Sequence, residues 1–208
     1  MHWLLAQTEG YYLTTPDAAV RRKTSEYFAE LTRFCRDVGG RIMVLGSPKQ
    51  RNLLPGVTHA DGVHYAADVI RGFVPTLQEC GVTLAVEPLG PQEGDFLLTA
   101  DAAGELIQRV DSPHCRLHLD VKAMATETKP IVDIIRDNAQ RLAHFHANDP
   151  NRRGPGMGPL DFVPIFRVLR EINYQGWVSV EVFDYAPGVE ALARESMTYM
   201  QQCLQTLA

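Results

Sequence analysis

Four residues whose side chains could share one metal ion stand at the ends of four short apolar stretches: Glu87, Asp120, His146 and Glu181. The stretches read LAVEP, LHLDV, AHFHAND and VSVEV. Successive members lie 33, 26 and 35 residues apart, and each interval is about the length of one strand–helix unit. A carboxylate or imidazole on an apolar strand is costly to bury unless it is paired or bound to a cation. The pattern therefore predicts a single divalent metal site at one end of a parallel β-barrel.

The donor types narrow the choice of metal. Three carboxylates and one imidazole carry a formal charge of −3, which a divalent cation would largely offset. Oxygen-rich donor sets with one histidine favour Mn²⁺, Mg²⁺ or Co²⁺ over structural zinc, which prefers cysteine and histidine. Any one of these residues alone would be read as an ordinary polar residue at a strand end. Four of them in phase on consecutive strands favour the metal site.

The elements that must position these residues alternate along the chain between short apolar runs and longer stretches of helical period. We predict strands at residues 2–6, 41–46, 82–87, 115–122, 142–147 and 177–183, and helices at residues 16–38, 61–80, 99–110, 130–138, 161–172 and 188–207. Thr15 is the expected N-cap of the first helix, and a polar loop is expected at residues 47–60. Strands that alternate with helices imply a parallel sheet with right-handed crossovers.

Six strands and six helices fall short of a closed barrel, which needs eight units and typically about 250 residues. We therefore predict an α/β fold of the TIM (β/α)8 type, a single domain over residues 1–208 with the first two βα units missing. Either the sequence starts late, or an open barrel closes through contacts with a partner, which allows a homodimer. A doubly wound open sheet is the alternative, and the absence of a Gly-rich phosphate turn after any strand disfavours it.

Composition excludes several classes of protein. The chain has 208 residues, 45% of them hydrophobic, and a formal charge of −5, which suits one soluble α/β domain rather than a nucleic-acid-binding surface. No apolar run approaches the roughly 20 residues of a membrane span, and the N-terminus does not resemble a secretory signal. Four scattered cysteines without a CxxC pair indicate reduced thiols, so we expect a cytoplasmic protein.

These features together resemble the xylose-isomerase-like superfamily of sugar isomerases and epimerases, and are nearest to the ketose 3-epimerases. The resemblance covers nearly the whole chain, from LTTPDAAVR through the last helix. That family holds one divalent metal with Glu, Asp, His and Glu on its fifth to eighth strands. The matching residues are Glu87, Asp120, His146 and Glu181, which numbers the strands present as three to eight.

The resemblance also implies substrate contacts. Glu93 lies six residues after Glu87, where ketose epimerases place a glutamate that contacts substrate hydroxyls, although a solvated loop charge is an equal alternative. Arg152 lies six residues after His146, where the family places a substrate-binding arginine, and Arg153 is the competing candidate. The stretch RRGPGMGPLDF resembles the PGxGxxD loop of the family.

One position departs from the pattern. Many members have a histidine three residues after the aspartate of the sixth strand, and Ala123 stands there instead. Lys122, two residues after Asp120, is expected on the same strand face, where it could bind an anionic substrate group or be a surface lysine. The substitution weakens the assignment to a true ketose 3-epimerase and removes a ligand that related endonucleases need.

Four further residues have two interpretations. His118 and His144 lie two residues before predicted ligands and should point into the barrel, where a hydrogen-bonded core histidine is favoured over a metal ligand. Lys49 and Arg51 in the 47–60 loop could bind an anionic group, and a solvated loop is at least as well supported.

The implied chemistry is proton transfer at a carbon next to a carbonyl, through an enediolate that a metal stabilises. The resemblance implies Glu87 and Glu181 as the acid–base pair acting on a small ketose or related sugar. Return of the proton to the opposite face gives epimerisation, return to the adjacent carbon gives isomerisation, and loss of a β-hydroxyl gives dehydration. A dehydratase of the inosose or dehydroshikimate type and a non-catalytic metal-binding member remain alternatives. A nucleic-acid endonuclease is disfavoured by the negative charge.

Overall fold

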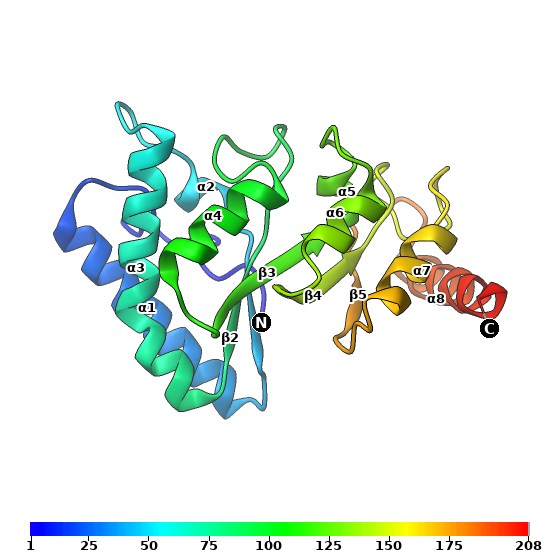
Figure 1. The fold of residues 1–208 in the computed structure, drawn as a ribbon, viewed down its shortest axis with the longest axis horizontal. Coiled ribbons are helices and arrows are strands. Elements are labelled where there is room, and N and C mark those ends of the chain that lie inside the picture. Colours follow the sequence, from blue (N-terminus) through cyan, green and yellow to red (C-terminus); the bar gives the residue numbers. More distant parts are fainter. Residues whose placement is uncertain (208) are drawn as a thin grey trace. The chain divides into compact units, whose positions relative to one another are not determined.

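Parallel strands and helices alternate along residues 1–207, which the computed structural model describes (Figure 1). The elements in chain order are α1 (Ala18–Asp37), β1 (Ile42–Leu45), α2 (Pro48–Arg51), α3 (His59–Cys80), β2 (Thr83–Val86), α4 (Ala100–Val110), β3 (Cys115–Asp120), α5 (Val121–Met124), α6 (Ile131–Asp137), β4 (Leu142–Ala147), α7 (Val163–Glu171), β5 (Val178–Val180) and α8 (Val189–Thr206). The strand order is β1-β2-β3-β4-β5. The predicted α/β class with parallel strands is confirmed.

The chain forms two compact units, Met1–His118 and a second that begins at Leu119, so that the boundary lies within β3. In the first unit, β1 pairs in parallel with β2, and β2 with β3. The central residues of these strands are buried throughout, as expected for parallel strands covered on both faces. Figure 1 shows α1 and α3 side by side, and the rings of Phe28 and Phe73 stack between them at 5.0 Å.

Local capping sets the helix ends of the first unit. The side chain of Asp17 accepts hydrogen bonds from two amides of the first turn of α1, so Asp17 rather than the expected Thr15 is the N-cap. Thr58 and Asp61 form a capping box at the start of α3, and Gly81 ends that helix in the left-handed conformation with a φ of 62°. The side chain of Thr99 accepts from the amide of Ala102 and caps α4.

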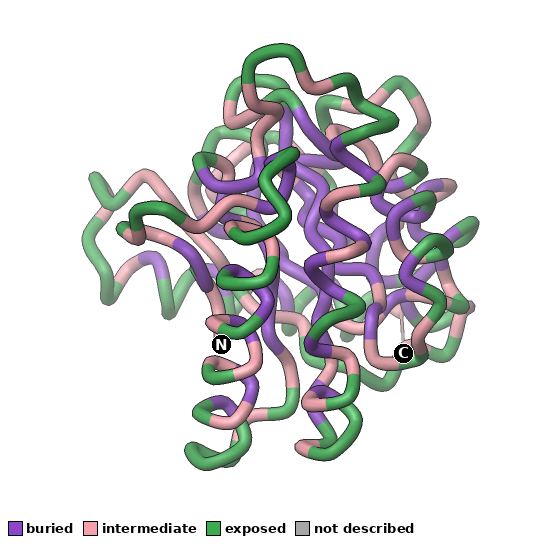
Figure 2. Tube along the Cα trace, turned by 90° about the vertical axis from the view of Figure 1, so that its left-hand side faces the viewer, coloured by how far each residue is buried: buried purple, intermediate pink, exposed green. Residues whose placement is uncertain are grey.

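The second unit contains β4 and β5, which pair in parallel with Phe145 beside Val178. The helices α7 and α8 lie side by side (Figure 1) and bury apolar residues such as Phe166 and Met200. The helices of the chain alternate between buried and exposed residues along their length (Figure 2), which is typical of helices that pack one face inward. Among residues 1–207, no helix has the length and apolar character needed to cross a membrane.

The predicted strand at residues 2–6 is wrong, so residues 1–207 contain five strands instead of the six predicted. Met1 bonds beside β1, where its carbonyl accepts from the amide of Val44 at 2.8 Å and its amino group donates to the carbonyl of Ile42 at 2.7 Å. The chain then turns, with a φ of 58° at Trp3, and the turn buries Leu4 and Leu5. The apolar run that suggested a strand therefore reflects two leucines packed on a turn.

Two further boundaries differ from the prediction. The expected loop at 47–60 contains the short helix α2. The expected strand at 115–122 ends at Asp120, because the carboxylate of Asp120 accepts from the amide of Ala123 at 2.9 Å and begins the helix α5. The proposed single domain over residues 1–208 stays a prediction.

Candidate metal centre

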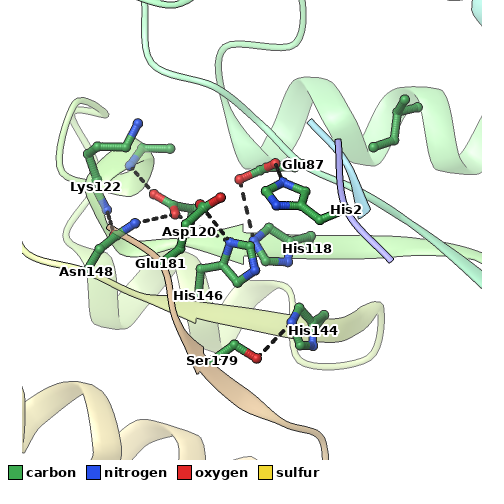
Figure 3. A network of polar contacts seen from close by, with 12 residues as sticks. His2, Glu87, His118, Asp120, Lys122, His144, His146, Asn148, Ser179 and Glu181 are labelled. Atoms are coloured by element: carbon green, nitrogen blue, oxygen red, sulfur yellow. Dashed lines mark hydrogen bonds and ion pairs between the residues drawn. The ribbon is translucent and has the colours of Figure 1, made fainter. Parts of the chain in front are cut away.

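The first unit places Glu87 directly after β2, with its side chain buried between two histidines (Figure 3). Its Oε2 lies 3.5 Å from Nε2 of His2, and its Oε1 lies 3.6 Å from Nε2 of His118. His118 is fully buried and Glu87 is only 3% exposed, and the burial of His118 fits a core histidine and a metal ligand equally. A buried carboxylate flanked by imidazoles is a group whose charge needs compensation.

Gly46, the residue after β1, makes room for this carboxylate. A Cβ atom at position 46 would overlap Oε2 of Glu87 and would lie 3.0 Å from its Cδ and 3.4 Å from Nε2 of His2. The absence of a side chain therefore lets the carboxylate lie against the backbone.

The second unit brings together Asp120 at the end of β3, His146 in β4 and Glu181 just after β5 (Figure 3). Nδ1 of His146 lies 3.0 Å from Oε2 of Glu181 and 3.8 Å from Oδ2 of Asp120. These three residues form a cluster of two carboxylates and one imidazole. Two of them, Asp120 and His146, are almost excluded from solvent, with exposures of 2% and 5%. We refer to these three residues as the Asp–His–Glu cluster.

The environment of Asp120 opposes its charge. Burial raises the pKa of Asp120 above its usual value, and the nearby carboxylate of Glu181 adds to this effect. Hydrogen bonds from the amide of Ala123 and from Nδ2 of Asn148, the latter at 2.6 Å, act in the opposite direction, as does the positive charge of Lys122. A cation at the cluster would stabilise the ionised form that burial disfavours.

The donor set fits a divalent metal. Donor atoms of Asp120 and His146 lie close enough together to hold one ion, and Glu181 supplies a further oxygen beside His146. Carboxylate oxygens with one imidazole suit Mn²⁺, Mg²⁺ or Co²⁺. The carboxylate of Glu87 in the first unit offers donors of the same kind.

Asn148 and Asp149 are fully buried polar residues beside the Asp–His–Glu cluster that the sequence did not single out. Asn148 donates to Asp120 and accepts from the backbone amide of Lys122 at 2.8 Å, so it links the Asp–His–Glu cluster to α5. The only signal in the sequence was a pair of polar residues directly after the predicted ligand His146.

The carboxylate of Asp149 organises the loop that follows β4. It accepts from the amides of Asn151 at 3.2 Å and Leu160 at 3.3 Å, while its own amide donates to the carbonyl of Arg153 at 2.9 Å. A Cβ atom at Gly158 would overlap this carboxylate. The loop is therefore folded around one buried side chain.

Two of the predicted substrate-binding residues, Glu93 and Arg152, lie in different settings. Glu93 is half-buried in a turn, where its amide donates to the carbonyl of Gly90 at 2.9 Å. Arg152 has an exposed side chain and a φ of 73°, and its carbonyl accepts from the amides of Phe183 and Asp184 at 2.8 and 3.0 Å. Their roles in substrate binding stay predictions.

Lys122 lies in α5, so the expectation that it shares a strand face with Asp120 is wrong. Its Nζ lies 4.7 Å from the ring centroid of Phe183, within range of a cation–π interaction. Arg153, the competitor of Arg152, donates from Nε to the carboxylate of Asp184 at 2.8 Å. That pairing favours a structural role for Arg153.

Arg51 and His144 are two of the residues for which the sequence left two interpretations open. Arg51 is 1% exposed and donates to backbone carbonyls, so it neither binds an anion nor lies in a solvated loop. The helix α2 turns it inward. His144 is half-buried, and its Nε2 lies 3.2 Å from the hydroxyl of Ser179.

A parallel α/β fold with acidic and imidazole side chains gathered at its strand ends is typical of barrel proteins that carry their site at that end of the sheet. The chain belongs to the xylose isomerase-like TIM barrel family, whose sequence profile matches residues 2–203. The predicted family and barrel type are thereby confirmed.

Several relatives are named epimerases. The chain is 28% identical to a probable ketose 3-epimerase of Synechocystis sp., over 95% of this chain and 74% of that protein. It is 37% identical to a D-psicose 3-epimerase of Enterocloster bolteae over 114 residues, which cover 55% of this chain and only 38% of that protein. The solved structure of an L-ribulose 3-epimerase superposes with a TM-score of 0.84 at 25% identity, covering 95% of this chain and 72% of that one.

Proposed function

We propose that this chain carries out metal-dependent epimerisation or isomerisation of a small ketose or related sugar. The observation that carries the proposal is the Asp–His–Glu cluster, in which Nδ1 of His146 lies 3.0 Å from Glu181 and 3.8 Å from Asp120. The names of the relatives, D-psicose 3-epimerase and probable ketose 3-epimerase, support the reaction class.

The proposed ligands of one Mn²⁺, Mg²⁺ or Co²⁺ ion are Glu87, Asp120, His146 and Glu181. When bound, the ion supplies positive charge that stabilises negative charge developing on substrate oxygens. The chain itself orients the donors: Asn148 fixes the carboxylate of Asp120, and the missing side chain at Gly46 leaves space for Glu87.

Glu87 and Glu181 are the proposed acid–base pair. One carboxylate removes the proton from the carbon next to the carbonyl, and the other returns a proton to the opposite face. The 14% exposure of the Glu181 side chain and the near-complete burial of Glu87 support this role, because exclusion of water strengthens the electrostatic interactions of a site. Glu93, Arg152 and Lys122 are the proposed substrate contacts.

The four cysteines among residues 1–207 are free thiols, which supports a reducing compartment, and we propose the cytoplasm. A homodimer also stays a prediction.

The deciding experiment uses the full chain, stripped of metal with a chelator and then supplied with Mn²⁺. D-psicose, D-fructose and L-ribulose are incubated with it in deuterated water, and the products are followed by NMR. Deuterium at the carbon whose configuration inverts, with the carbonyl unmoved, supports epimerisation. Deuterium at the original carbonyl carbon, with the carbonyl moved to its neighbour, supports isomerisation. Loss of water would indicate the dehydratase, and tight Mn²⁺ binding without turnover would indicate a non-catalytic member.

The role of Glu181 is tested by Glu181→Gln, which we expect to abolish turnover while the circular dichroism spectrum stays that of the wild type. Glu195→Gln, an exposed substitution of the same kind in α8, is the matched control and should keep full activity. Retained turnover in Glu181→Gln would contradict the assignment.

A further inference from the structure

Arg51 is a fully buried cation that the proposed reaction does not use. Its guanidinium donates to four backbone carbonyls. Nη1 donates to the backbone carbonyls of Leu45, at 3.3 Å, and of Glu87. Nη2 donates to the backbone carbonyls of Phe96, at 2.9 Å, and of Leu97, at 3.1 Å. An arginine side chain can donate to this many acceptors because its planar guanidinium carries five N–H groups.

The four carbonyls belong to three separate segments of the first unit. Leu45 is the last residue of β1, Glu87 directly follows β2, and residues 96–97 precede α4. Leu97 has a φ of 56°, which a bulky residue adopts only when its surroundings hold it there. Arg51 is therefore a crosslink that fixes the backbone at the residue that carries the Glu87 carboxylate.

The positive charge of Arg51 also interacts with the carboxylate of Glu87. Burial lowers the pKa of Arg51 to about 10, and the carboxylates of Glu87 and Glu93 act against that lowering. The guanidinium is consequently still protonated near neutral pH, so the crosslink carries a full positive charge.

We propose that Arg51 is a positioning residue for Glu87, which holds the backbone at the end of β2 so that the carboxylate reaches the metal in one orientation. This inference rests on the proposed role of Glu87 as a metal ligand. The competing role is a crosslink that stabilises the first unit and has no effect on the metal. The two roles differ in what happens to metal affinity when the protein stays folded.

The test compares Arg51→Lys and Arg51→Met with Phe28→Leu, which loosens the stacked pair between α1 and α3 away from Glu87. Mn²⁺ affinity is measured by calorimetry on the chelator-stripped full chain, and thermal unfolding is measured alongside. All three variants should unfold at lower temperature. Only the Arg51 variants should bind Mn²⁺ about 10-fold more weakly or worse, the usual effect of losing a group that orients a ligand. Wild-type affinity in folded Arg51→Lys would overturn the inference.

The wild-type protein gives a second measurement that does not depend on a variant folding. If the Arg51 crosslink favours metal binding, then metal binding must stabilise the crosslink by the same free energy. Mn²⁺ should therefore slow amide hydrogen exchange in residues 45–51 and 96–97 as well as at Glu87. Unchanged exchange in both segments would overturn the inference.

Glu87→Gln separates this inference from the proposed function. Wild-type Mn²⁺ affinity in Glu87→Gln would overturn the proposed ligand role of Glu87 and this inference with it, while the proposed function, which rests on the Asp–His–Glu cluster, would stand. Weakened affinity in Glu87→Gln together with unchanged affinity in Arg51→Lys would overturn this inference alone.

Discussion

Gly46→Ala tests whether the space beside Glu87 matters for the metal. The new methyl group would overlap Oε2 of Glu87 and lie 3.0 Å from its Cδ, so the carboxylate must move by about 1 Å or more to restore a normal contact. A misplacement of about 1 Å at a reacting group can cost about 100-fold in rate. We therefore expect kcat/KM to fall about 100-fold and Mn²⁺ affinity to fall about 10-fold.

The fold should survive this change, because the clash involves the end of a side chain and the φ of Gly46 is not among the positive values. An overpacking cost of about 1 kcal/mol would lower the melting temperature by roughly 2–4 °C. The measurements are calorimetry with Mn²⁺, initial rates with D-psicose and thermal unfolding.

Gly72→Ala is the matched control for Gly46→Ala. Its methyl group would overlap the hydroxyl oxygen of Ser25 and lie 3.1 Å from the Cβ of Ser25, a clash of similar size in the same unit. This control should keep its metal affinity. The reasoning is refuted if Gly46→Ala binds Mn²⁺ and turns over substrate as the wild type does, or if Gly72→Ala loses metal affinity equally.

Further predictions concern the second unit and the thiols. Asn148→Ala should weaken Mn²⁺ binding about 10-fold by calorimetry, because Asp120 loses the amide that orients it, and unchanged affinity would exclude that role. Burial raises the pKa of Cys115 from 9.0 to about 12, so the unfolded thiol ionises first and folding loses stability as pH rises above 9. The wild type should have a higher free energy of unfolding in urea than Cys115→Ala, and this difference should shrink by about 1 kcal/mol between pH 8 and pH 10. A difference that stays constant over this pH range would contradict the reasoning. Cys80, the one half-buried cysteine among residues 1–207, should react first with a thiol reagent, and mass spectrometry after short labelling would identify it.

Hydrophobic periodicity was sufficient to place β1 to β4 and the long helices, because parallel strands buried on both faces leave an unmistakable apolar run. It failed at residues 2–6, where the same composition buries Leu4 and Leu5 on a turn. An apolar pattern of five residues indicates burial but not which groups form hydrogen bonds. A buried strand and a buried turn therefore cannot be distinguished from it.

The candidate ligands were visible in the sequence because their chemistry conflicts with an apolar strand. The residues that orient them were not visible, because their roles depend on contacts distant in sequence. Asn148 reaches Asp120 across 28 residues, and Arg51 reaches the carbonyl of Glu87 across 36. Lys122 was misplaced because the capping bond from Ala123 to Asp120 ends the strand early, and such a bond has no signature in periodicity.

The loop folded around Asp149 has a consequence for engineering. Its two ends are held by one carboxylate, which bonds the amides of Asn151 and Leu160, and its close approach to Gly158 fixes the path between them. An exposed side chain of this loop, such as that of Arg152, can therefore be varied to change ligand preference without rebuilding the scaffold. Asp149, Gly158, Gly154 and Gly156 must be kept, because a Cβ atom at Gly154 would overlap the hydroxyl of Ser196 and one at Gly156 would overlap the ring of Tyr199.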